Sequence, residues 1–176
     1  MMIKDAEFAA RLKREIQSLV KLSHPNIVNV MDVGEHDGLP FAVMQYLAGG
    51  SLEDRSRPCT PDEVAAWLPD VADALDFIHS KGLIHRDIKP GNIMVSEAGD
   101  PILLDFGLAK DQEDLEASMT ETGGLMGTPA YMSPEQIAAK RVRMDHRTDV
   151  YSLGVTLFEC LTVTRPFEKP TRDALY

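Results

Sequence analysis

The chain has 176 residues, of which 44% are hydrophobic and 26% are charged. That length and composition fit one globular domain, or a part of a larger one. The formal net charge of -10 disfavours non-specific binding to nucleic acid and to anionic membrane surfaces.

The sequence carries no membrane segment and no secretory signal. No run of about 18 apolar residues occurs, and the first residues are amphipathic but acidic. Cys59 and Cys160 have no metal-ligand spacing, so we interpret them as free thiols in a reducing cytosol. We therefore expect a cytoplasmic protein, or the cytosolic part of a longer membrane-anchored one.

The N-terminal quarter predicts one helix and one hairpin. Apolar residues recur at helical spacing over residues 5–22, and Pro25 prevents the helix from continuing. Two apolar runs occur at residues 27–34 and 40–47, and an Asp-Gly turn at 37–38 lies between them. This pattern predicts two antiparallel strands.

A long helix is expected from Pro61 to about residue 81, with Thr60 as its N-cap. Pro69 lies inside this helix and removes one backbone hydrogen bond or causes a kink. Trp67 is assigned to the core. The predicted buried stripe consists of Val64, Leu68, Val71, Leu75 and Ile78.

The second half of the chain predicts two short strands and two helices. The strands cover 92–95 and 101–105, and a long polar segment follows at 106–132. The segment 133–140 predicts a short helix. The apolar segment 147–162 predicts a helix that is buried on most sides.

The stretch HRDIKPGN, residues 85–92, concentrates the chemistry. Asp87 can accept or orient the proton of a hydroxyl group, and Lys89 can neutralise a phosphate that is being transferred. Asn92 and Asp105, on neighbouring strands, supply the oxygen ligands that a divalent cation prefers. A base beside two metal ligands is typical of phosphoryl transfer.

These motifs resemble those of the eukaryotic-like serine/threonine protein kinases, most closely the bacterial ones. The catalytic loop at 85–92 is followed by Asp-Phe-Gly at 105–107, by GTPAYMSPE at 127–135 and by DVYSLGV at 149–155. The resemblance implies an α+β, protein-kinase-like fold of two lobes that is incomplete. A partial N-lobe would cover 1–46 and a C-lobe 47–176.

The resemblance also implies roles for the site residues and the cofactors ATP and Mg²⁺. Asp87 would be the catalytic base, and Lys89 would steady the γ-phosphate. Asn92 and Asp105 would hold Mg²⁺. Residues implied to contribute to the ATP site are Glu15, Met44 as gatekeeper, Gln45 and Leu47 through their main chains, and Met94 beneath the adenine ring.

Regulation is implied by Arg86, which in this family pairs with a phosphate on the activation loop. Thr120 and Thr122 are the expected phosphorylated residues, and Thr128 belongs to the pattern of Ser/Thr rather than Tyr kinases. Self-association for autophosphorylation would follow. The expected partners are proteins with Ser or Thr hydroxyls, not nucleic acid.

Three polar residues are assigned structural roles. Asp149 is expected to accept hydrogen bonds from the backbone of residues 85–87. His85 is interpreted as a packing residue rather than a base, and His79 as an ordinary helix or surface residue.

Two parts of such a kinase are not found in the sequence. No glycine-rich loop and no strand lysine precede Glu15, and the arginine expected to pair with Glu135 is not present before Tyr176. We therefore expect a kinase fragment truncated at both ends that is inactive or weak in isolation. The alternative is a non-catalytic, pseudokinase-like interaction module. A small-molecule kinase of related fold is disfavoured by the segment 127–135.

Overall fold

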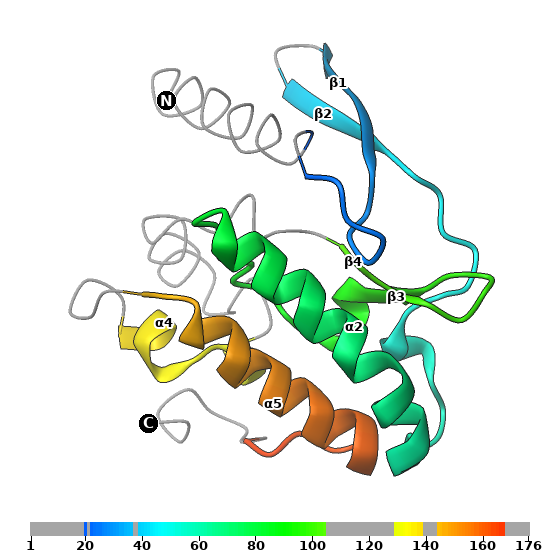
Figure 1. Ribbon diagram of the computed structural model, residues 1–176. Helices are drawn as coiled ribbons and strands as arrows, with labels where there is room; N and C mark the ends of the chain where they lie inside the picture. The colour runs from blue at the N-terminus through cyan, green and yellow to red at the C-terminus, as the bar shows by residue number, and fades with distance from the viewer. Residues whose placement is uncertain (1–19, 21, 37–38, 105–128, 139–143, 168–176) are drawn as a thin grey trace.

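The computed structural model describes residues 20, 22–36, 39–104, 129–138 and 144–167 (Figure 1). The predicted helix at 5–22 lies almost wholly outside these residues, and so does most of the polar segment 106–132. The described residues form a mixed fold of helices and strands. The α+β class expected from the sequence is confirmed.

The first structural unit is the hairpin of β1 (Val30–His36) and β2 (Leu39–Met44), which are antiparallel as predicted. Val30 pairs with Met44, and the register shifts between Val30 and Asp32. The strand begins three residues later than the sequence predicted. The reason is that Ile27 pairs with a different strand.

A second hairpin contacts both the segment before β1 and the segment after β2. It consists of β3 (Ile93–Val95) and β4 (Pro101–Leu103). On one edge Ile27 forms a parallel bridge with Leu103, and on the other Ser51 forms an antiparallel bridge with Met94. Segments far apart in sequence therefore meet on this small hairpin, as Figure 1 shows.

The long helix α2 (Pro61–Ser80) has nearly the bounds that the sequence predicted. Thr60 is its N-cap, and Glu63 completes a capping box. The helix continues through Pro69. Leu68 is only partly buried, and Trp67 joins the core as expected. The buried residues of the helix are Val64, Trp67, Val71, Ala74, Leu75 and Ile78.

The helix α5 (Arg147–Thr162) lies beside α2, and the short helix α4 (Pro134–Ala138) lies near its N-terminal half (Figure 1). The predicted bounds of α5 are confirmed, but its predicted burial on most sides is wrong. Large apolar side chains of α5 are exposed, namely Val150, Phe158 and Leu161. Its buried face is mostly small and polar, with Thr148, Asp149, Ser152, Val155, Thr156 and Cys160.

None of the helices in the described residues is long and apolar enough to cross a membrane.

Candidate active site

The turn that carries the predicted catalytic residues is held by one buried carboxylate, that of Asp149. Its Oδ2 accepts the backbone N–H of His85 and its Oδ1 accepts that of Arg86, both at 2.8 Å. Arg86 has a φ of 66°, which a residue other than glycine adopts only when its surroundings enforce it. The prediction that Asp149 is a structural acceptor for this turn is confirmed.

Two histidines complete the support of the turn. His85 is fully buried, and its Nε2 lies 2.8 Å from the carbonyl oxygen of Leu104. Its predicted packing role is confirmed. His79 Nε2 lies 2.7 Å from Asp149 Oδ2, so His79 is not the ordinary surface residue that we expected. The C-terminal part of α2 brings this ring to the first turn of α5, a contact between distant segments.

Asp87, Lys89 and Asn92 come together in one polar cluster. The Nδ2 group of Asn92 donates to the backbone oxygen of Asp87 at 2.8 Å and to its Oδ2 at 2.9 Å. The Lys89 Nζ lies 3.3 Å from the same Oδ2. The side chains of Asp87 and Lys89 are only 13% and 25% exposed, so their charges interact more strongly than on an open surface. The cluster thus fixes the direction of the Asp87 carboxylate.

The same contacts test whether Asn92 fits a magnesium ion. Both Asp87 oxygens that it contacts are acceptors, so Asn92 must present its NH₂ group to them. Its Oδ1 therefore points the other way, which leaves an oxygen ligand of the kind that Mg²⁺ prefers. The second predicted ligand, Asp105, lies outside the described residues. Its neighbour Leu104 donates its N–H to the carbonyl of Asn92 at 2.9 Å.

A glutamine that sequence reasoning did not identify connects α4 to the catalytic turn. Gln136 is buried, and its Nε2 donates to the backbone oxygen of Arg86 at 2.9 Å. Its Oε1 accepts the N–H of Ser133 at 2.9 Å. No local pattern marks Gln136, because its role depends on a contact across fifty positions of sequence.

The predicted regulatory residues are only partly described. Arg86 Nε is buried and has no hydrogen-bond partner among the described residues. Its predicted counterparts Thr120 and Thr122 lie outside those residues, and so does Thr128. The regulatory role of Arg86 stays a prediction.

The predicted adenine site lies where β2 ends. Met44 is the last residue of β2 and is 41% exposed. The N–H of Gln45 donates to the carbonyl of Asn29 at 3.0 Å, so only the carbonyl of Gln45 remains to bind a ligand. Met94 is half-buried in the middle of β3. Leu47, half-buried, follows in the segment that connects to η1 (Leu52–Asp54), and Glu15 lies outside the described residues.

A further polar network, which the sequence did not predict, packs η3 (Pro129–Tyr131) onto α5. The Tyr131 hydroxyl donates to the Glu159 carboxylate, whose other oxygen lies 3.1 Å from Arg165 Nε. Burial first, and then the contacts with Glu159, raise the pKa of Tyr131 above its usual value. Arg165 is thus paired with Glu159. We had expected that it does not pair with Glu135, and this is confirmed. Glu135 accepts the hydroxyl of Thr148 at 2.8 Å.

Comparisons with known proteins agree with this geometry. Residues 2–176 match the family model described as the protein kinase domain. The chain is 42% identical over 172 residues to a probable serine/threonine-protein kinase of Corynebacterium efficiens. It is also 42% identical over 171 residues to the serine/threonine-protein kinase PknB of Mycobacterium tuberculosis. These matches cover 94% and 93% of the chain but only 26% and 27% of the relatives.

A solved structure shares the fold. It is a crystal structure of Rad53 in complex with AMP-PNP, with a TM-score of 0.76 and 30% sequence identity. The match covers 93% of this chain and 41% of that one. The chain therefore spans about a quarter of the length of the two curated relatives and less than half of this structural one.

Proposed function

Because the chain belongs to the protein kinase family and resembles its serine/threonine members, we propose that it transfers the γ-phosphate of ATP to Ser and Thr hydroxyls of proteins. The observation that carries this proposal is the cluster of Asp87, Lys89 and Asn92, held on a strained turn by Asp149. Charged groups held in a fixed arrangement next to a residue with positive φ are typical of functional sites.

The mechanism assigns Asp87 to the attacking hydroxyl. Its carboxylate is oriented by Asn92, so that it can accept the proton as the hydroxyl oxygen attacks the γ-phosphorus. Lys89, which pairs with Asp87 in this structure, would neutralise the charge of the phosphoryl group during its transfer.

The cofactor site is proposed from the residues that fit it. Asn92 Oδ1, together with Asp105, would hold Mg²⁺, which supplies charge neutralisation on the ATP phosphates. The Gln45 carbonyl and the main chain of Leu47 would bind the adenine edge, between Met44 and Met94. Glu15 is assigned to the same site from the resemblance alone.

Regulation is proposed to act through Arg86. Phosphorylation of Thr120 or Thr122 would place about -1.5 to -2 charges where the Arg86 guanidinium could bind them. Autophosphorylation in trans would require a transient self-association. Mass spectrometry of active protein should find phosphate on one of these threonines. Active protein with both threonines unmodified would contradict this part of the proposal.

The test of the function is a segment exchange. The matched part of the kinase domain of PknB from Mycobacterium tuberculosis is replaced by residues 2–176. The PknB sequence that remains is expected to supply the glycine-rich loop and the strand lysine that this sequence lacks. We call this protein the exchange chimera. It should phosphorylate a protein substrate from γ-labelled ATP, and Asp87→Asn should lower the rate by at least about 100-fold without unfolding it.

The outcome distinguishes the two functions that the sequence left open. A folded exchange chimera without activity would favour the non-catalytic interaction module. The isolated 176-residue chain, assayed in parallel, is expected to show little or no activity. Robust phosphorylation by that chain, abolished by Asp87→Asn, would contradict this expectation.

A further inference from the structure

The two cysteines of the chain meet at a place that the kinase mechanism does not use. Cys59 lies just before the N-cap of α2, and Cys160 lies in the last turns of α5. Both are free thiols, as the sequence predicted, and they are only 4% and 7% exposed. The backbone N–H of Cys59 donates to the carbonyl oxygen of Cys160 at 2.7 Å.

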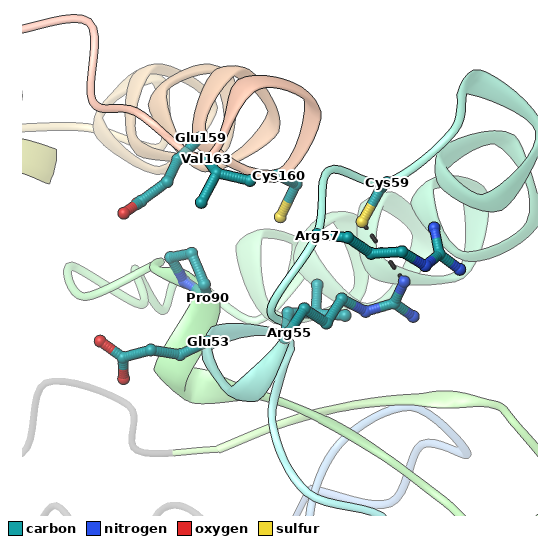
Figure 2. Close-up of a pocket in the computed structure, with 9 residues that line it drawn as sticks. Glu53, Arg55, Arg57, Cys59, Pro90, Glu159, Cys160 and Val163 are labelled. Atoms are coloured by element: carbon teal, nitrogen blue, oxygen red, sulfur yellow. Dashed lines mark hydrogen bonds between the residues drawn. The ribbon is translucent and has the colours of Figure 1, made fainter.

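This backbone contact limits how far apart the two residues can be. Standard covalent geometry on either side of the hydrogen bond caps the separation of the two Cα atoms at about 6.6 Å. Disulfides in proteins join Cα atoms that are about 4.4–6.8 Å apart. The two side chains also line the same pocket, and Figure 2 shows them directed into it. A disulfide could therefore form here without moving either helix.

The pair is reached through a pocket of about 60 Å³, which both cysteines line. Figure 2 shows the pocket between the segment with Glu53 and Arg55, the turn at Pro90, and the end of α5. The volume is sufficient for a molecule the size of hydrogen peroxide. Arg55 Nη1 lies 3.4 Å from the Cys59 sulfur, so a positive charge faces the atom that would become negative on losing its proton.

We propose that Cys59 and Cys160 are a redox-active pair, which hydrogen peroxide or a related peroxide converts to a disulfide that ties the N-terminal end of α2 to the C-terminal end of α5. The Cys59 thiolate attacks one peroxide oxygen and breaks the O–O bond, giving a sulfenic acid and, after protonation, water. The Cys160 sulfur then attacks the Cys59 sulfur and releases the second oxygen as water. Two thiols are oxidised and one peroxide is reduced to two waters.

The order of the two steps follows from the surroundings of each sulfur. Burial, assisted by the neighbouring Cys59, raises the pKa of Cys160 to about 12, so Cys160 is a poor first nucleophile. Cys59 has the guanidinium of Arg55 beside it, and its backbone N–H donates to the carbonyl of Cys160. Cys59 therefore reacts first and Cys160 resolves the sulfenic acid.

The experiment measures disulfide closure at low micromolar concentration in the exchange chimera, in which any cysteine of the PknB part is replaced by serine. The reduced chain is treated with hydrogen peroxide in native buffer and, in parallel, in urea. It is then unfolded and alkylated with iodoacetamide, and its intact mass is measured. The native sample should lose two hydrogens, resist alkylation and revert with dithiothreitol. Closure should be faster in native buffer than in urea, because only the folded chain holds the thiols together.

Because Cys59 and Cys160 are then the only cysteines of the exchange chimera, any internal disulfide must join them. Cys59→Ser and Cys160→Ser should each abolish closure. Arg55→Met should slow closure several-fold, whereas Arg57→Met should not, since Arg57 contacts Glu63 and not a sulfur. A native chain that keeps two alkylatable thiols, or that closes no faster than the chain in urea, would overturn the proposal. Equal rates for Arg55→Met and the parent would overturn the assigned order of attack.

Discussion

At the scale of single residues, the site depends on one side chain that never touches substrate in the proposed mechanism. Asp149 is fully buried and accepts two backbone N–H groups while facing His79. The hydrogen bonds from the backbone of His85 and Arg86 to Asp149 hold Arg86 at its positive φ. They thereby position Asp87, the next residue. The position of the proposed catalytic base is therefore set by α5, which follows residues 85–92 by more than fifty positions.

Asp149→Ala should be strongly destabilising. The substitution leaves buried N–H donors without an acceptor, and such losses cost about 3 kcal/mol or more when a buried charged partner is removed. Urea unfolding of the exchange chimera measures the change in the free energy of unfolding. Asp145→Ala is the control, because Asp145 pairs with Arg147 on the surface, where ion pairs contribute little, and the substitution should cost much less. Equal effects of the two substitutions would contradict the role given to Asp149.

The sequence predicted the residues of the proposed catalytic cluster but not all of the residues that support it. Asp87, Lys89 and Asn92 are identified by motif spacing alone, and the structure brings them together. Gln136 and His79 have no such signal, because their contacts join segments that are distant along the chain. Supports of this kind become visible only when the helices are packed.

At the scale of elements, helix caps and helical periodicity predicted the bounds of the long helices reliably. The Thr60 cap and Pro61 gave the start of α2, and the apolar run gave both ends of α5. The start of β1 was wrong by three residues because Ile27 bridges Leu103. The predicted burial of α5 was also wrong, because small and polar residues occupy its buried face, where Ser152 and Thr156 donate to backbone carbonyls, while Val150, Phe158 and Leu161 are exposed. Pairing between distant segments decided the first case.

The N-terminus of α2 predicts a dependence on pH. The Arg57 hydrogen bond, and then the N–H of Thr60, lower the pKa of Glu63 to about 2. Because this pKa is lower in the folded state, the stabilisation is full above the ordinary value of 4.5 and disappears as the pH falls through about 2. The stability difference between the exchange chimera and its Glu63→Gln variant should therefore be constant near neutral pH and shrink below about pH 4.5.

Denaturant unfolding at several pH values measures this difference. Thr60→Ala is the companion variant, and it should cost about 1 kcal/mol through loss of the N-cap. A Glu63→Gln difference that stays the same down to pH 2 would show that the Glu63 charge does not stabilise the helix.

Two glycines should respond in opposite directions to alanine. A Cβ at Gly49 would lie 1.9 Å from the backbone oxygen of Val95, where the chain after β2 meets β3. Gly49→Ala should therefore force these segments apart and destabilise the exchange chimera. A Cβ at Gly154, inside α5, meets nothing within 4 Å, so Gly154→Ala should stabilise by about 0.5–1 kcal/mol. Thermal melts of both variants check the signs, and a neutral Gly49→Ala would refute the close contact.

At the scale of the whole molecule, the described residues leave two apolar surfaces open to solvent. One is on the β1–β2 hairpin, where Met31, Phe41, Val43 and Met44 are 41–67% exposed. The other is on α5 and the segment after it, with Val150, Phe158, Leu161, Val163 and Phe167. Single exposed apolar residues are ordinary, but groups of this size on one element favour association.

The isolated 176-residue chain should therefore self-associate or melt without cooperativity. A two-stranded hairpin is marginal by itself, and an open strand edge with apolar side chains offers pairing to another copy. Light scattering after size exclusion should show a mass that rises with concentration, and calorimetry should show a broad transition. Phe41→Lys together with Phe158→Lys should reduce the association, because charge on each surface opposes contact. A concentration-independent monomer with one sharp transition would mean that the internal core around α2 and α5 is sufficient to hold these residues together.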